Sequence, residues 1–262
     1  MAYPSAKYFK ETFYYMQAFT SKTIREIALE APETTRVFEE FKIDYCGGRK
    51  SLDDACREAG MDPSLIADKI ESAMKDHSNR QEPASVKDQT ASELINHIVA
   101  KHHIFTVEEI ERLTPLMEKV CSRHGEQHPD LFELQSVFLA LADSLIPHMR
   151  KEEMVLFPYI QSLESSLTGA IDVLPPHFGT VENPIRMMMV DHEADGERLR
   201  KMRHIANNYT LPDNACPSFT ALYRGLEELE KDLHRHIHLE NNVLFPAAVE
   251  LERSVLGGPQ TM

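Results

Sequence analysis

The most constraining feature of this sequence is a pattern that occurs twice, H-x-x-x-E-x-x-V-L-F-P. The first copy runs from His148 to Pro158, and the second runs from His236 to Pro246, 88 residues later. One such match has little weight, but two with identical spacing in one chain indicate an internal repeat. Because residues i and i+4 share one face of a helix, each copy places a histidine beside a glutamate, ahead of an apolar tail.

A histidine and a glutamate on a core-facing stripe are costly to bury unless they are paired or bind a metal. Leu141 and Leu145 lie on the same predicted face as His148 and Glu152, so this pair faces a core. Helical bundles build metal sites from such pairs on facing helices. A lone H-x-x-x-E is most often a solvated pair, whereas the duplicated one predicts a shared metal site.

The repeat also locates two single histidines on other segments. His192 lies 44 residues before His236, and His103 lies 45 residues before His148. His103 shares a helical stripe with flanking apolar residues, which supports it as a ligand. His102, at a spacing of 46, fits slightly less well, but periodicity alone does not exclude it.

The predicted ligand set therefore combines four imidazoles with two carboxylates, and the carboxylates are placed to bridge two metals. Its members are His103, His148, Glu152, His192, His236 and Glu240. Structural zinc prefers four ligands, often thiolates, so six mixed ligands favour a pair of redox-active iron ions.

The rest of the sequence has the apolar periodicity of helices, with no alternating strand pattern and no hairpin signal. Thr90 and Glu93 form a capping box ahead of an apolar run. Four long amphipathic helices are expected, at about 91–124, 130–165, 182–207 and 214–254. The expected fold class is all-α, a four-helix bundle with one longer connection at about 166–181.

The N-terminal part predicts a separate small domain. We expect short helices in residues 1–76, a polar linker in residues 77–89 and the bundle domain in residues 90–256. Start signals for the short helices are Ser21, Ser51 and the pair Asp62–Pro63, the last opening a helix through about Lys75.

Composition excludes several classes of partner. The net charge of −14 argues against nucleic acid and against an anionic membrane surface as partners. No apolar run has the length of a membrane span, and the first residues lack the pattern of a signal peptide. The four cysteines lack paired spacing, so neither a disulfide framework nor a zinc finger is expected. We expect a cytoplasmic protein with reduced thiols.

These motifs resemble a known family. Residues 91–254 resemble a hemerythrin-like domain through the segments INHIVAKHH, HMRKEEMVLFP, MVDHEADGE and DLHRHIHLENNVLFP. Nearly the whole chain resembles the iron–sulfur cluster repair di-iron proteins of the RIC or ScdA type, which join a small N-terminal domain to such a bundle. The N-terminal motif of that family, Asp-[Phe/Tyr]-Cys-Cys-Gly-Gly, corresponds here to Asp44-Tyr45-Cys46-Gly47-Gly48, without the second cysteine.

The resemblance implies a non-haem di-iron centre with an oxo or hydroxo bridge, held by the four histidines and bridged by Glu152 and Glu240. It implies repair of iron–sulfur clusters damaged by nitric oxide or oxidative stress, by iron donation. Damaged iron–sulfur proteins would be the partners, and NO and O2 the small ligands. Without the second cysteine of the motif, Cys46 is expected to act alone, as a thiol ligand or a redox thiol. Apart from the resemblance, the aromatic-rich first 16 residues would allow a homodimer.

Two alternative functions remain at this point. One is a hemerythrin-like protein that binds or senses O2 or NO. The other is an enzyme, an NO reductase or a peroxidase, acting at the same centre. The oxygen carriers of the wider family use five histidines, so the four counted here favour the repair type.

Overall fold

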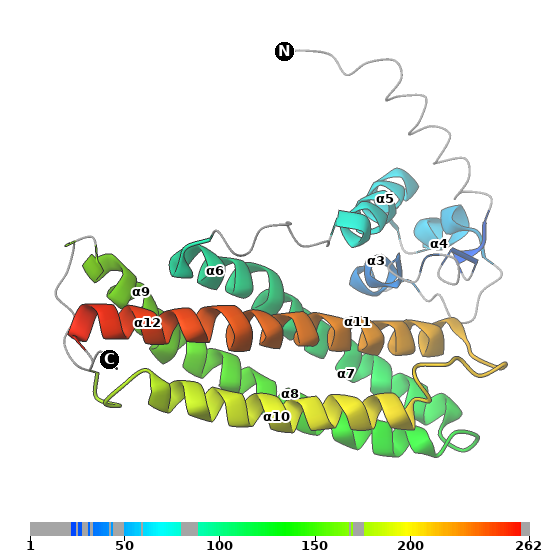
Figure 1. Cartoon of the computed structure of the whole chain (residues 1–262). Coiled ribbons are helices and arrows are strands. Elements are labelled where there is room, and N and C mark those ends of the chain that lie inside the picture. The colour runs from blue at the N-terminus through cyan, green and yellow to red at the C-terminus, as the bar shows by residue number, and fades with distance from the viewer. Residues whose placement is uncertain are drawn as a thin grey trace, which may run out of the picture. The chain divides into compact units, whose positions relative to one another are not determined.

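The computed structural model describes residues 22–24, 26–27, 31, 34–41, 43, 50–58, 60–79, 89–167, 169 and 176–257. The chain divides into two compact units. One comprises residues 1–82 with 211–224, and the other comprises 83–210 with 225–262. Figure 1 shows that the described parts of both units are built from helices.

The described part of residues 1–82 contains three short helices, α3 (Thr35–Glu40), α4 (Leu52–Glu58) and α5 (Pro63–Asn79). Two of the predicted start signals are confirmed by hydrogen bonds. The Asp54 amide donates to the hydroxyl of Ser51 at 3.2 Å, and the Ser64 amide donates to the Asp62 carboxylate at 2.9 Å. These side chains satisfy backbone donors that a helix start leaves without partners.

Two boundaries in this unit differ from expectation. Ser21 lies outside the described residues, and the capping box is made by Thr23, whose hydroxyl and amide exchange hydrogen bonds with Glu26. A capping box needs Glu or Gln three residues on, which Thr23 has and Ser21 lacks. Helix α5 continues past Lys75 to Asn79, so residues 77–79 of the expected linker are helical. No Gly or Pro interrupts the chain there.

The four predicted long helices are present, which confirms the all-α bundle. They belong to the second unit, except that residues 217–224 at the start of the last helix belong to the first unit. Three of them are interrupted by a π-helical turn, labelled η. In chain order they are α6 (Ala91–His97), η3 (Ile98–His103) and α7 (Ile104–His124); α8 (Asp130–Lys151), η4 (Glu152–Leu156) and α9 (Phe157–Leu167); α10 (Glu182–Ile205); and α11 (Pro217–Leu239), η5 (Glu240–Leu244) and α12 (Phe245–Leu256).

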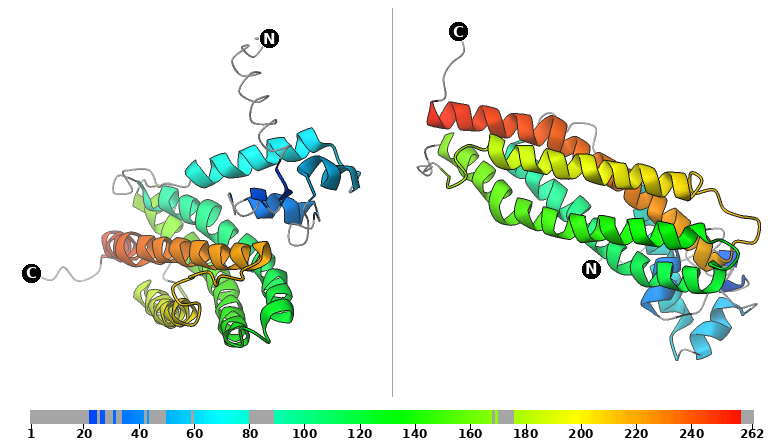
Figure 2. Two further views of the ribbon diagram at one scale, coloured as in Figure 1. Left: turned by 90° about the vertical axis from the view of Figure 1, so that its right-hand side faces the viewer. Right: turned by 90° about the horizontal axis from the view of Figure 1, so that it is seen from below.

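These helices lie side by side in both views of Figure 2. Helix α8 packs against α7 and α10, and α9 packs against α6 and α12. We refer to α6–α9 as the first hairpin and to α10–α12 as the second. The fourth long helix begins at Pro217 rather than near residue 214, because proline is favoured at the first helical position, where its missing N–H is not needed.

The π-helical turns were not predicted from the sequence, and two of them have a clear cause. Both η4 and η5 end at a leucine that is followed by a phenylalanine and then a proline, Pro158 or Pro246. The amides of Phe157 and Phe245 donate five residues back, to the carbonyls of Glu152 and Glu240. A proline ring clashes with the carbonyl four residues before it, so a wider turn just ahead of the proline relieves that clash.

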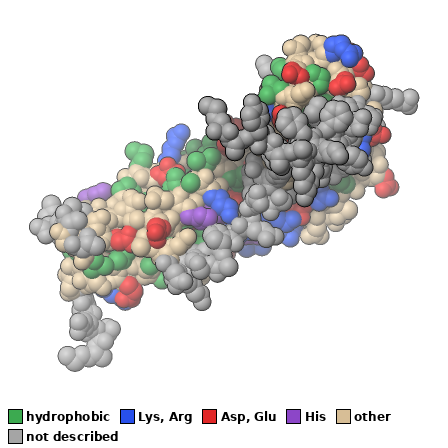
Figure 3. Space-filling model, turned by 90° about the horizontal axis from the view of Figure 1, so that it is seen from above, with side chains coloured by type: hydrophobic (Ala, Val, Ile, Leu, Met, Phe, Trp, Pro, Cys, Tyr) green, Lys and Arg blue, Asp and Glu red, His purple; other side chains and the backbone are tan. Residues whose placement is uncertain are grey.

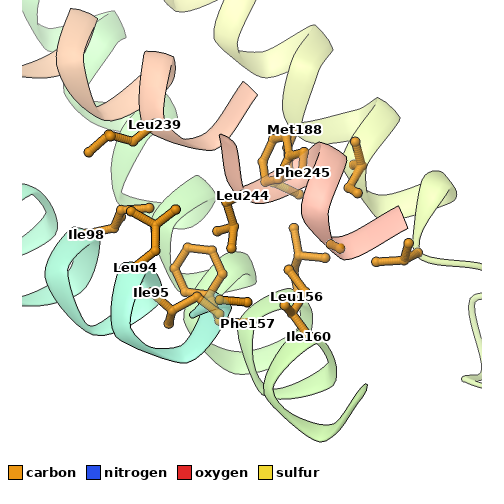
Figure 4. Packing of buried hydrophobic residues seen from close by; sticks show 14 residues of the cluster. Leu94, Ile95, Ile98, Leu156, Phe157, Ile160, Met188, Leu239, Leu244 and Phe245 are labelled. Atoms are coloured by element: carbon orange, nitrogen blue, oxygen red, sulfur yellow. The ribbon is translucent and has the colours of Figure 1, made fainter. Parts of the chain in front are cut away.

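The apolar tails of the repeat form the core at one end of the bundle (Figure 4). Leu156, Phe157, Leu244 and Phe245 are each at most 2% exposed and belong to one cluster. The cluster also contains Leu94, Ile95, Ile98, Ile160, Met188 and Leu239. The repeat therefore brings its two glutamates to a position directly beside a dry core, and the V-L-F-P tail builds that core.

The surface of the described helices is mixed in character. In Figure 3, acidic, basic and apolar side chains lie interspersed on the visible face of the bundle. Among the described residues, no helix combines the length and the apolar character that crossing a membrane demands.

The first long helix is capped from a distance as well as locally. The predicted capping box of Thr90 and Glu93 is present, and the Glu164 carboxylate also accepts from the amides of Ala91 and Ser92, at 2.8 and 3.0 Å. We expect Glu164→Ala to lower the free energy of unfolding by about 1–2 kcal/mol, the range found for lost helix caps. Urea unfolding of the metal-free protein measures this loss.

The control for that experiment is Glu118→Ala, which removes an exposed glutamate from the same long helix. It should change stability by less than about 0.5 kcal/mol, as surface substitutions generally do. Equal losses in the two variants would show that the Glu164 contact contributes nothing.

Candidate metal centre

The six side chains predicted as ligands meet inside the second unit. They come from all four long helices, and each side chain is buried. Exposed fractions are 2% for His103, 1% for His148, 0% for Glu152, 5% for His192, 1% for His236 and 0% for Glu240. Burial of two carboxylates beside four imidazoles is unusual in a core unless a cation accompanies them.

The imidazoles form two pairs. The Nε2 atoms of His103 and His236 are 3.1 Å apart, and those of His148 and His192 are 2.9 Å apart. We call the space beside the first pair position A and the space beside the second pair position B. Each pair joins one histidine of the first hairpin to one of the second, so each position needs both hairpins.

Each glutamate turns one oxygen toward each position. In Glu152, Oε1 is 3.2 Å from His148 Nε2 and Oε2 is 3.6 Å from His103 Nε2. In Glu240, Oε1 is 2.9 Å from His236 Nε2 and Oε2 is 3.2 Å from His192 Nε2. At both positions, ligand atoms of two histidines and both glutamates lie within 4.8 Å of one another. This is the geometry of two bridging carboxylates.

The carboxylate oxygens provide a test of whether a metal fits. Both oxygens of Glu152 and the Oε2 atom of Glu240 are buried without a hydrogen-bond partner. An anionic oxygen left so in a protein interior carries a large desolvation cost, which a coordinated cation removes. The buried His and Glu side chains therefore suit a non-haem iron site.

The charges of the metal-free cluster are strongly coupled. Burial alone lowers the pKa of His148, but the Glu152 carboxylate 3.2 Å away outweighs it and raises this pKa to about 9. The pKa values of His103 and His192 are raised by Glu240 in the same way, against the effect of burial. Burial raises the pKa of Glu240, but the surrounding imidazoles, His236 foremost, hold it well below its usual value. Cationic charge is thus favoured at this point of the core.

In the structure, the two neighbouring histidines of the first long helix have different surroundings. His103 lies in the cluster, whereas Nδ1 of His102 lies 3.0 Å from the Asp232 carboxylate. His102 also stacks on the ring of His236, with centroids 5.9 Å apart and planes at 12°. His102 is therefore beside the cluster but does not belong to either group of ligand atoms, and His103 stays the predicted ligand.

Three of the four cluster histidines have a partner at Nδ1, on the side away from the cluster. Nδ1 of His103 lies 2.6 Å from Glu153, that of His148 lies 3.2 Å from Asp191, and that of His192 lies 2.9 Å from Asn241. Such partners fix the ring and its tautomer when Nε2 binds a metal.

Sequence reasoning found these outer partners only in part. Glu153 and Asp191 are acidic residues next to predicted ligands in the sequence. Glu193, a third such neighbour, is exposed and paired with Arg200. Asn241 was missed. The repeat held the signal, because Asn241 follows Glu240 just as Glu153 follows Glu152.

The repeat phenylalanines support the rings of the single histidines. Phe157 stacks on His103 with centroids 5.7 Å apart, and Phe245 stacks on His192 with centroids 6.0 Å apart. The two contacts are equivalent in the repeat. Each phenylalanine therefore belongs both to the apolar core and to the wall of the metal centre.

The cysteines contribute nothing to this cluster in the described chain. The predicted redox thiol Cys46 lies outside the described residues, with the turn 44–48 that carries it. Cys56 and Cys121 are buried, and burial raises the pKa of each thiol. A raised pKa keeps a thiol protonated and unreactive, as expected for small core residues.

Known proteins share both parts of this architecture. Residues 94–248 match the family Hemerythrin HHE cation binding domain. Residues 20–74 match ScdA_N, described as Domain of Unknown function (DUF542). The two matches cover the bundle that holds the histidine–glutamate cluster and the N-terminal helices, respectively.

Full-length relatives extend this match over most of the chain. The chain is 34% identical to the iron–sulfur cluster repair protein YtfE of Dickeya chrysanthemi (strain Ech1591) and 32% identical to that of Yersinia pseudotuberculosis, covering 89% of this chain and 99% of each relative. It is 30% identical to a probable iron–sulfur cluster repair protein of Haemophilus influenzae, over 87% of this chain and 97% of that protein. The chain thus belongs to the iron–sulfur cluster repair protein family, in which an ScdA_N domain precedes a hemerythrin HHE cation binding domain.

Proposed function

We propose that this protein holds two iron ions at positions A and B and supplies iron for the repair of damaged iron–sulfur clusters. The observation that carries the proposal is the pair of buried carboxylates that face both imidazole pairs and whose oxygens have no partner other than the cluster imidazoles. The names of the relatives support the repair role. Damage by NO or by oxidants is the condition under which such a role is expected.

The number and kind of ligands favour non-haem iron over structural zinc, which prefers four ligands and often thiolates. Mixed imidazole and carboxylate ligands with open positions are typical of non-haem iron.

The residues of the chain perform three tasks in this proposal. His103, His148, His192 and His236 would hold the ions through Nε2, and Glu152 and Glu240 would bridge them. The core of leucine and phenylalanine side chains excludes water from one side of the centre. Bound iron would supply redox chemistry and an exchangeable cation, and carboxylate bridges are ligands that can release a metal.

The first experiment is elemental analysis of protein purified without oxygen and without added metal. We expect close to two iron ions per chain, because the centre offers two equivalent sets of ligand atoms. Zinc, a single ion per chain or no uptake of iron on reconstitution would contradict the proposed centre.

The second experiment tests repair itself. An iron–sulfur dehydratase inactivated by NO is incubated with the iron-loaded protein, or with the same amount of free ferrous iron in the presence of a chelator. We expect recovery of dehydratase activity only with the protein, together with loss of its own iron. Retention of both ions, with reversible binding of O2 or NO and no recovery, would indicate a carrier or sensor instead.

A further inference from the structure

The repeat relates the two halves of the centre residue by residue. His103 corresponds to His192 at an offset of 89, and His148 and Glu152 correspond to His236 and Glu240 at an offset of 88. The contacts outside the cluster can therefore be compared between the halves. One type of contact to Nδ1 is the same in both halves, and one type differs between them.

The contact that follows the repeat serves the single histidines. Glu153 accepts from Nδ1 of His103, and Asn241, its counterpart, accepts from Nδ1 of His192. In both halves, the residue after a bridging glutamate fixes the ring of a histidine on another helix. Positions A and B are equal in this respect.

The contact that breaks the repeat serves the other two histidines. At position B, Nδ1 of His148 lies 3.2 Å from the Asp191 carboxylate. The counterpart of Asp191 is His102, which turns its own Nδ1 to Asp232 instead. Nδ1 of His236 is buried and has no hydrogen-bond partner among the described residues.

This difference bears directly on metal affinity. When Nε2 of a histidine binds a metal, Nδ1 carries a proton, and an acceptor for that proton orients the ring and increases its basicity. Loss of such an acceptor typically weakens metal binding by about 10–100-fold. Position B has acceptors for both of its histidines, whereas position A has one only for His103.

We propose that the two metal positions differ in lability, and that the ion at position A, between His103 and His236, is the one released. The proposal rests on the proposed function, because it names the half of the two-iron centre that donates. Position B then keeps its ion and holds the bundle in its loaded form. The hydrogen bond between His102 and Asp232 leaves His236 without the acceptor that Asp191 gives to His148.

The test follows iron release into a coloured ferrous chelator by stopped-flow absorbance, using full-length protein loaded with two ferrous ions per chain without oxygen. We expect two phases of equal amplitude whose rates differ by about 10–100-fold. A single rate for both ions would overturn the proposal.

Two variants assign the phases to positions. His102→Asp with Asp232→Ser copies Asp191 and Ser144 from the other half and gives His236 its missing acceptor, so the fast phase should slow toward the slow one. Asp191→Ala removes the acceptor of His148, so the slow phase should become fast. Circular dichroism shows whether the first variant retains its helices. If it does not fold, Asp191→Ala alone tests which position releases its ion slowly.

The outcomes separate this proposal from the function on which it rests. Protein that cannot be loaded with two ions contradicts the two-iron centre, and this inference with it. A two-ion protein whose fast phase is accelerated by Asp191→Ala, while its slow phase is unchanged, places the labile ion at position B. That result overturns the present assignment and leaves the proposed function standing.

Discussion

Glu240→Ala should reduce the iron content to well below one ion per chain. Its carboxylate lies 2.9 Å from His236 Nε2, 3.2 Å from His192 Nε2 and 3.8 Å from His103 Nε2, so it contacts ligands of both positions. Removal of a bridging ligand weakens both positions at once, and we expect at least the upper part of the effect of about 10–100-fold known for lost outer partners. Iron analysis after gel filtration measures the loss.

The matched control is Glu250→Ala, which removes an exposed glutamate one element further along the same long helix. It should retain both ions. If Glu240→Ala also retains two ions, the Glu240 carboxylate is not a bridge and the proposed set of ligands is wrong.

The second large effect is expected from Phe245→Ala. The ring is 2% exposed, lies in the apolar cluster and stacks on His192 with the planes at 3°. Truncation of a buried phenylalanine to alanine costs about 3–5 kcal/mol, through lost burial and the cavity left behind. Urea unfolding of the metal-free protein measures this cost apart from any effect of iron.

Two further variants show whether the loss of stability comes from the missing apolar volume. Phe245→Leu should cost much less, because it keeps most of the apolar volume. Met187→Ala, at a 58% exposed position on α10, should change stability by less than about 0.5 kcal/mol. A loss for Phe245→Ala no greater than that of Met187→Ala would show that the repeat tail does not support the fold.

Much of the fold could be predicted from the sequence because its signals are local and repeated. The capping box at Thr90, the long apolar periods and the prolines that separate them placed the four helices to within a few residues. The convergence of the six cluster residues followed from the repeat, because residues at matching heights on facing helices must meet. The sequence favoured His103 over His102 through its apolar stripe but did not exclude His102, since adjacent residues on a helix can both reach a core.

The π-helical turns and the outer contacts could not be predicted in the same way. Hydrophobic periodicity assumes a uniform helix, and a wider turn shifts the face on which every later residue lies. Partners such as Asn241 on His192 depend on side chains of different helices, which spacing along one helix does not relate. The absence of an acceptor at His236 is a property of packing, which no residue pattern shows.

The crossed pairing of the histidines also constrains when the centre can form during synthesis. The first hairpin emerges from the ribosome with two imidazoles and one bridging carboxylate, but each metal position lacks a histidine until the second hairpin follows. His236 and Glu240 lie in the last long helix of the chain. If the cluster holds two ions as proposed, neither finds a complete site on a nascent fragment, and loading awaits closure of the finished bundle.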